Sequence, residues 1–144
     1  MRRLSLQIQA DPDAGPLPAD RRQLRRWVQA ALATDAQLVL RFVGRDEGRA
    51  LNRQFRARDR PTNVLTFDYE REPVVHADIV ICLPVLRAEA TAQRKPERDH
   101  LAHLVVHGVL HAQGHDHEDD ADARRMESLE TAILRRFGID DPYA

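Results

Sequence analysis

The sequence predicts a single α+β domain spanning residues 1–144, with about four strands in a central sheet and four to five helices. Two observations support this fold class. Short apolar runs or alternating segments, typical of strands, are interspersed with longer segments in which apolar residues recur at helical spacing. A chain of 144 residues is long enough for one hydrophobic core, and no internal repeat or proline-rich linker divides it.

Four segments have the pattern of strands. Residues 4–8 alternate between apolar and polar side chains, as expected of a half-buried strand. Residues 37–43, 63–67 and 77–83 are short runs rich in the apolar, branched and aromatic residues that favour strands. The pattern does not determine the order of these strands in the sheet.

Five segments show helical periodicity, and several carry signals at their ends. Asp46 is a plausible N-cap, and Gly138 marks the end of the last helix. The predicted helices cover residues 20–33, 46–55, 85–93, 97–113 and 119–137. The last of them is expected to bury one apolar face made of Met126, Leu129, Ile133 and Phe137.

The helix over residues 97–113 is apolar around almost its whole circumference, which is typical of a buried helix. The exception is a stripe at four-residue spacing, formed by His103, His107 and His111. We expect this stripe to open onto a cleft. His103 is expected to lie beside the site in that cleft and not to be a ligand.

The stripe continues into a pattern that is typical of a metal site. His107 and His111 are one helical turn apart, and Gly114 can end the helix in a left-handed conformation so that His117 turns back toward them. Three imidazoles that leave one coordination position open are the ligand set of a catalytic zinc, and this spacing is that of metzincin peptidases. The sequence therefore predicts His107, His111 and His117 as metal ligands.

The residue after the first histidine argues against a peptidase. Zinc peptidases of the HExxH type have a glutamate at that position, which acts as the general base. Here the position is Gly108, which has no side chain that could transfer a proton. A metal hydrolase acting on peptides or small molecules is therefore disfavoured, although the metal geometry is retained.

Charge and cysteine content set further bounds. Residues 41–60 contain seven arginines against three acids, so this segment either binds a polyanion or forms a solvated helix face. Residues 116–130 are strongly acidic.

The single cysteine, Cys82, excludes an internal disulfide and is expected to be buried and inert. No apolar run approaches the roughly 20 residues that span a bilayer, so we expect a cytoplasmic location and no membrane partner.

At this point the chain resembles the YbeY family of bacterial endoribonucleases and rRNA maturation factors. The resemblance rests on several blocks in order: the pattern from His107 to His117, Leu51-Asn52, Phe55-Arg56-x-Arg58-Asp59, the segment from Pro61 to Phe67, the segment from Asp78 to Cys82, Glu89-Ala90, and Met126 with Glu130. Two positions depart from the usual blocks. Ala77 stands where glycine is usual, and His115 replaces a tyrosine.

The resemblance implies one zinc ion per chain, held by the three histidines, and a functional arginine at Arg56 as the candidate catalytic residue. It implies single-strand-specific endoribonuclease activity in rRNA maturation, notably at the 3′ end of 16S rRNA, and a role in ribosome quality control. The partners would be RNA (the 16S rRNA precursor and ribosomal particles), with ribosomal proteins or assembly GTPases as further candidates.

Two alternatives stay open from the sequence. The protein could be a non-enzymatic ribosome-assembly factor with a structural zinc, because no general base is evident. Arg56 could make a structural ion pair and not a phosphate contact. The attacking group, either an RNA 2′-hydroxyl or a hydroxide generated at the metal, is also not determined.

Overall fold

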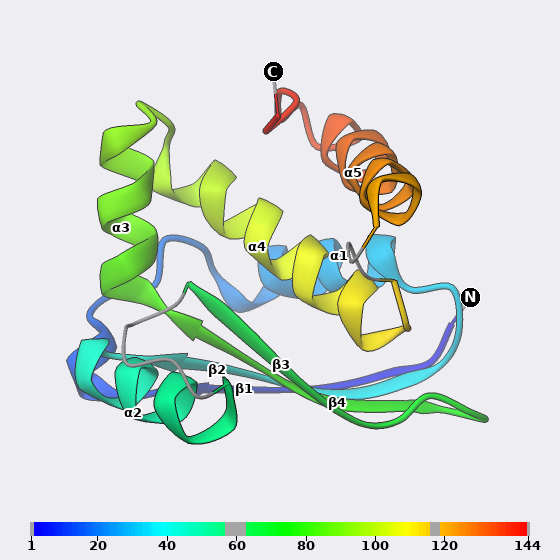
Figure 1. Cartoon of the computed structure of the whole chain (residues 1–144), viewed down its shortest axis with the longest axis horizontal. Coiled ribbons are helices and arrows are strands. Elements are labelled where there is room, and N and C mark those ends of the chain that lie inside the picture. The colour runs from blue at the N-terminus through cyan, green and yellow to red at the C-terminus, as the bar shows by residue number, and fades with distance from the viewer. Residues whose placement is uncertain (1, 57–62, 116–118, 144) are drawn as a thin grey trace.

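The computed structural model describes residues 2–56, 63–115 and 119–143, and its four strands form one sheet (Figure 1). The strands are β1 (Leu4–Ala10), β2 (Ala36–Val43), β3 (Val64–Glu70) and β4 (Val75–Cys82). Their order is β1-β2-β4-β3, with β1, β2 and β4 parallel and β3 antiparallel to β4. All four predicted strands are therefore present, and the α+β class is confirmed.

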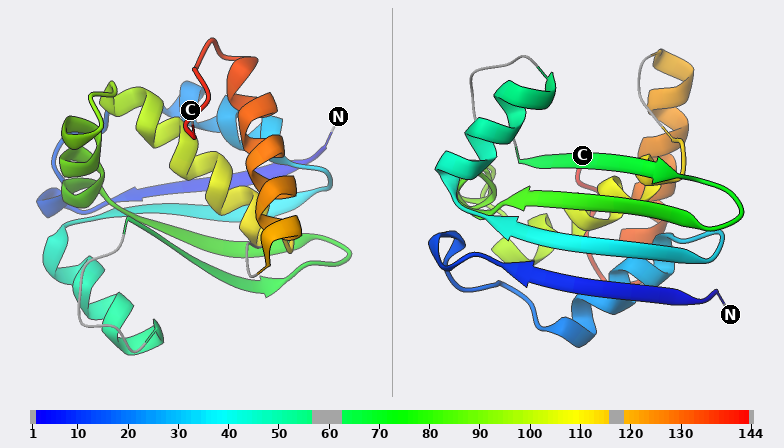
Figure 2. Two further views of the ribbon diagram at one scale, coloured as in Figure 1. Left: turned by 45° about the horizontal axis from the view of Figure 1, so that its top comes forward. Right: turned by 90° about the horizontal axis from the view of Figure 1, so that it is seen from below.

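The predicted helices are also present, with ends that differ from the prediction by a few residues. They are α1 (Arg21–Ala31), α2 (Arg45–Arg56), α3 (Leu83–Ala92), α4 (Glu97–Ala112) and α5 (Asp120–Arg135), and a 3-10 turn covers Pro12–Ala14. Figure 2 shows α1, α3, α4 and α5 on one side of the sheet and α2 on the other. Within the described residues, no helix is both long enough and apolar enough to cross a bilayer.

The sheet has one face packed against the core and one that is partly open. In β2, Leu38, Leu40 and Phe42 point to the helices and are buried, whereas Gln37 on the opposite face is exposed. This alternation follows from the two-residue period of a strand. Parallel neighbours need a crossover connection, and α1 supplies the one between β1 and β2.

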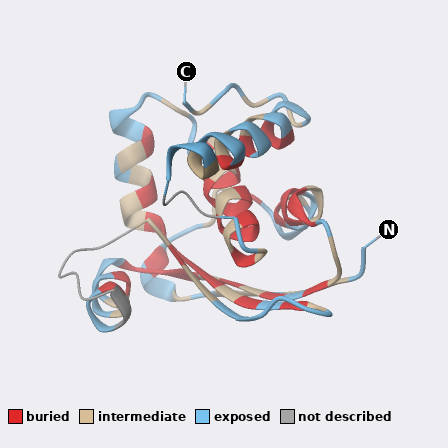
Figure 3. Ribbon diagram, turned by 45° about the vertical axis from the view of Figure 1, so that its right-hand side comes forward, coloured by how far each residue is buried: buried red, intermediate tan, exposed pale blue. Residues whose placement is uncertain are grey.

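Helix α4 lies at the centre of the core, in contact with α1, α3, α5, β3 and β4 (Figure 1). Every residue from Leu101 to Ala112 is buried except His103, His107 and His111, which are partly exposed. The buried helix with one polar strip, predicted from the helical wheel, is therefore confirmed. Figure 3 shows this pattern as a mainly red helix interrupted by tan.

Gly108 has a packing role that explains the absence of a side chain. A Cβ atom built on Gly108 would lie 2.8 Å from Cγ2 of Ile79, a fully buried residue of β4. Helix α4 therefore lies too close to β4 at this point to accept a Cβ atom without a shift. A glutamate at this position would be forced into the core and away from the histidine strip.

One prediction about α5 was wrong. Leu129 was expected on the buried face, but it is 38% exposed. The buried face instead contains Met126, Glu130, Ile133 and Leu134. Helix α5 is turned so that Glu130 points inward at α4, and this rotation moves Leu129 toward solvent.

Candidate metal centre

The histidine strip of α4 brings two of the predicted ligands together. The rings of His107 and His111 are stacked, with an interplanar angle of 4° and centroids 6.4 Å apart. They project from the same side of the helix because residues four apart lie about one turn from each other. His107 and His111 thus present two nitrogen donors along the one partly exposed strip of α4.

The end of α4 is held in place by its neighbours. The side-chain nitrogen of Gln113 donates to the Ala31 carbonyl at 2.7 Å, and its side-chain oxygen accepts from the Ala33 amide at 2.8 Å. Gly114 follows with a φ of +102°, and the amide of His115 then donates to the Leu110 carbonyl at 3.2 Å. The predicted helix stop at Gly114 is confirmed, and His115 is exposed.

Two of the predicted site residues cannot be placed in this arrangement. His117 lies outside the described residues. Arg56 is the last residue of α2, and its side chain is not among those that the structure describes. The assignments of His117 as a ligand and of Arg56 as a catalytic residue therefore remain predictions.

Glu130, on α5, is the residue that the sequence did not single out for this site. Its carboxylate is completely buried, and Oε1 accepts a hydrogen bond from Nδ1 of His107 at 2.7 Å. A hydrogen bond to a carboxylate places the ring proton on Nδ1, so Nε2 carries the lone pair that can bind a metal. Glu130 thus orients one of the candidate ligands.

Glu130 is ionised despite its burial. Burial on its own raises the pKa of Glu130, but hydrogen bonds from His103 and His107 outweigh it, together with one from Tyr143, and lower that pKa to about 2. Nε2 of His103 lies 3.3 Å from Oε2 of Glu130. The lowered pKa of Glu130 thus favours a negative charge on the carboxylate behind the histidine strip.

His103, His107 and Glu130 also form a group that could itself hold a metal ion, because one ligand atom from each lies within 4.8 Å of the others. In that arrangement the metal would replace the proton between His107 and Glu130. Imidazole and carboxylate are both common ligands of divalent metals. The donor set of the strip therefore fits a metal ion on either side of the His107 ring.

Arginines occur in ion pairs and near the C-terminal end of α4, and Arg71 belongs to both groups because it pairs with Asp68 at 2.9 Å. Arg41, in the basic segment predicted from the sequence, pairs with Glu47 at 2.8 Å and with Asp11 at 3.2 Å. Arg41 lies on strand β2, so it belongs to an ion-pair cluster and not to a solvated helix face. At the other end of the sheet, the guanidinium of Arg71 would contact a Cβ on Gly114 at 3.2 Å.

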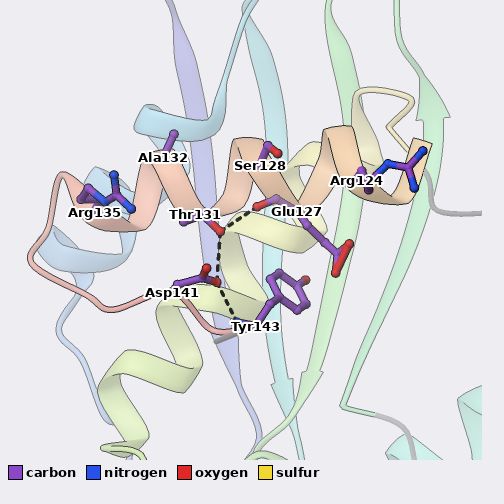
Figure 4. Close-up of a pocket in the computed structure, with 8 residues that line it drawn as sticks. All are labelled: Arg124, Glu127, Ser128, Thr131, Ala132, Arg135, Asp141 and Tyr143. Atoms are coloured by element: carbon purple, nitrogen blue, oxygen red, sulfur yellow. Dashed lines mark hydrogen bonds between the residues drawn. The ribbon is translucent and has the colours of Figure 1, made fainter. Parts of the chain in front are cut away.

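Arg124 adds a second cation near this end. It lines a pocket with Arg125 and His115, and it also lines the neighbouring pocket shown in Figure 4. The other residues drawn there include Glu127, Thr131 and Tyr143. The histidine end of α4 is thus flanked by arginines, a setting that suits a phosphate-bearing ligand.

Glu130 left a signal in the sequence that could have been followed. It falls at helical spacing between Met126 and Ile133, so a carboxylate stands on the apolar stripe of α5. A charged residue on a buried stripe needs a partner, and the histidine strip is a set of such partners.

Cys82 is buried as predicted, with its thiol 3.5 Å from the Gly44 carbonyl.

The chain is similar to known proteins over almost its whole length. A family model described as Endoribonuclease YbeY matches residues 15–138. The protein named Endoribonuclease YbeY from Methylibium petroleiphilum is 53% identical over 142 residues, which cover 99% of this chain and 94% of that protein. Its namesake from Bordetella pertussis is 55% identical over 152 residues, covering 97% and 96%.

A solved structure is similar as well. The solution structure of TM1509 from Thermotoga maritima matches with a TM-score of 0.63 and 27% identity, covering 90% of this chain and 87% of that one. The family resemblance inferred from the sequence motifs is confirmed. The match also includes most of the first forty residues, which precede the motif blocks.

Proposed function

This chain belongs to the endoribonuclease YbeY family, and from that premise we propose that it is a zinc-dependent endoribonuclease specific for single-stranded RNA. Its role would be rRNA maturation in the cytoplasm, at the 3′ end of 16S rRNA, and ribosome quality control. Residues 1–144 would act as one domain that holds one zinc ion. Its substrates would be the 16S precursor and ribosomal particles, with ribosomal proteins or assembly GTPases as further partners.

The observation that carries this proposal is the His107–Glu130 contact on the one open strip of α4. We assign His107, His111 and His117 as the zinc ligands, with Glu130 fixing the His107 ring from behind. A three-histidine zinc supplies Lewis acidity for a phosphate oxygen, and it leaves one coordination position open. His103 would stay outside the ligand set, hydrogen-bonded to Glu130.

The preference for RNA over peptide is supported by the surroundings of the strip. Gly108 faces Ile79 in the core, so the position of the peptidase general base is filled by helix–sheet packing. Arg71 and Arg124 lie near the C-terminal end of α4, and Arg71 also pairs with Asp68 at 2.9 Å. Guanidinium groups can bind phosphates with two parallel hydrogen bonds. Arg56 is proposed to contact the scissile region of the RNA.

Metal analysis combined with a cleavage assay on 16S precursor RNA tests the proposal. His107→Ala should lose both zinc and cleavage, because it removes a ligand. Arg56→Ala should keep zinc and lose cleavage, and Arg41→Ala serves as a control because Arg41 is ion-paired with Glu47. The proposal fails if fully zinc-loaded protein cleaves no RNA with or without ribosomal particles, or if His107→Ala cleaves at the rate of the unmodified protein.

A further inference from the structure

The last described residues fold back over the histidine strip and form a strap, which we define as residues 139–143. Two hydrogen bonds tie it to the rest of the chain, and a third lies within it. Nζ of Lys95 donates to the Pro142 carbonyl at 3.2 Å, and Oγ1 of Thr131 donates to Asp141 at 3.3 Å. The Tyr143 amide donates to the same oxygen of Asp141 at 2.8 Å (Figure 4). The strap is thus tied to Lys95, just before α4, and to Thr131 of α5.

The strap brings the Tyr143 side chain to Glu130. The phenol hydroxyl lies 2.6 Å from Oε2 of Glu130 and 3.1 Å from Nε2 of His103. The phenol hydroxyl donates to the carboxylate. The ring of Tyr143 meets His103 edge-on, with centroids 5.3 Å apart and an interplanar angle of 86°.

The same carboxylate therefore receives hydrogen bonds from two sides. Tyr143 donates to Oε2 and His107 donates to Oε1. A buried carboxylate that accepts several hydrogen bonds is fixed in its plane, since rotation would break all of them together. Tyr143 and His107 also line one cavity of about 310 Å³ with Glu130, so the phenol forms part of the wall beside the metal strip.

We propose that Tyr143 is a positioning residue of the metal site, which fixes the Glu130 carboxylate and through it the orientation of the His107 imidazole. This inference rests on the proposed function, because it takes His107 as a zinc ligand. Residues that orient a ligand directly typically change metal affinity by roughly 10–100-fold when removed. Tyr143 acts on the ligand only through Glu130. We therefore expect loss of its hydroxyl to weaken metal binding by about three- to tenfold.

Tyr143→Phe is the direct test, because phenylalanine keeps the ring against His103 and removes only the hydroxyl. Tyr69→Phe is a matched control. Tyr69 is the other tyrosine of the chain, and its hydroxyl also donates to a carboxylate, that of Asp78 at 2.8 Å. Binding of Co²⁺ and of Zn²⁺ alone, without RNA, is measured by competition against a chromophoric chelator.

Tyr143→Phe should bind Co²⁺ about three- to tenfold more weakly and alter the visible absorption spectrum of the bound Co²⁺. Tyr69→Phe should match the unmodified protein in both. Nitrogen-15 NMR of the metal-free protein gives a further readout: the Nδ1–H tautomer of His107 should dominate in the unmodified protein and be less populated in Tyr143→Phe. Unchanged affinity and spectrum in Tyr143→Phe overturn the inference.

Two more variants keep the outcomes distinct. Asp141→Ala releases the strap without altering the phenol, and it should weaken Co²⁺ binding in the same direction; wild-type affinity in this variant also counts against the inference. His107→Ala separates the two proposals. If it binds Co²⁺ normally, the proposed metal site is wrong, whereas loss of binding with a normal Tyr143→Phe variant refutes only the role of Tyr143.

Discussion

Oε1 of Glu130 lies 2.7 Å from Nδ1 of His107, although the two residues belong to different helices and are 23 positions apart. The Glu130 side chain is 0% exposed, and a buried charge of this kind is tolerated only when hydrogen bonds replace its hydration. The packing of α5 on α4 and the orientation of a candidate metal ligand are thus one structural feature. Any change that moves α5 is therefore expected to alter the orientation of His107 and the metal affinity of the candidate site.

The two possible metal positions can be separated by mutation. If the ion binds on the strip with His111, then His111→Ala should lower Zn²⁺ affinity by about 100-fold or more, while His103→Ala should lower it by no more than about tenfold. If the ion lies between His103, His107 and Glu130, the order of the two effects reverses. Competition titration of both variants measures the difference directly.

Removal of the metal should leave the domain folded. The core is built from apolar residues of the sheet, α1 and α4, and α4 is tied to α1 through Gln113 independently of any ion. We therefore expect a chelator to lower the melting temperature while the near-UV circular dichroism of the native state is kept. Cooperative unfolding on chelation would instead favour the non-enzymatic assembly factor with a structural zinc.

Gly108→Ala should destabilise the protein, although alanine normally favours a helix by about 1 kcal/mol over glycine. The added methyl would meet Ile79 at 2.8 Å, and overpacking of a core costs about 1–3 kcal/mol. We expect a net loss of roughly 1 kcal/mol in urea unfolding. In an Ile79→Ala background the same change should become neutral or stabilising, and an equal loss in both backgrounds would contradict the packing role.

Glu89 should make stability depend on pH in the acid range. Burial on its own raises the pKa of Glu89, but hydrogen bonds from His100 and Asn63 outweigh it and hold that pKa below its ordinary value of 4.5. A carboxyl whose pKa is lowered on folding stabilises the folded state above the unfolded pKa. That contribution is lost as the pH falls below 4.5 through the folded pKa.

Unfolding free energies of the unmodified protein and Glu89→Gln, measured from pH 7 down to pH 3, check this expectation. The variant should be less stable by about 1 kcal/mol at neutral pH, since Glu89 is partly exposed and solvent weakens its hydrogen bonds. The difference should shrink at acid pH. Glu70→Gln, at an exposed position at the end of β3, should show no such convergence. A constant difference at every pH would mean that the charge of Glu89 is not involved.

Much of the candidate site could be predicted because its signals are local. The strip of His103, His107 and His111 follows from the helical period, and the helix stop follows from the backbone freedom of Gly114. Both depend on residues within a few positions of one another. The predicted elements are present for the same reason, since apolar periodicity reflects which face of each segment is buried.

The parts that could not be predicted depend on contacts between distant segments. The strand order β1-β2-β4-β3 places β4 between two strands that precede it in the chain. The error at Leu129 arose because apolar character alone was used to orient α5, whereas the structure turns Glu130 inward toward the histidines. No local pattern identifies the contact of Tyr143 with Glu130, which lies 13 positions earlier in the chain.

The sequence by itself determined the fold class, the family and the donor strip on α4, because periodicity and motif spacing are properties of the chain. Only the tertiary structure decided what lies behind that strip. In the structure, Glu130 is buried against His107, and Tyr143 donates a hydrogen bond to Glu130. Ile79 packs against Gly108, the position that the general base occupies in peptidases. Those contacts form between elements whose relative placement is fixed by packing of the whole core, so no single segment of the sequence contains them.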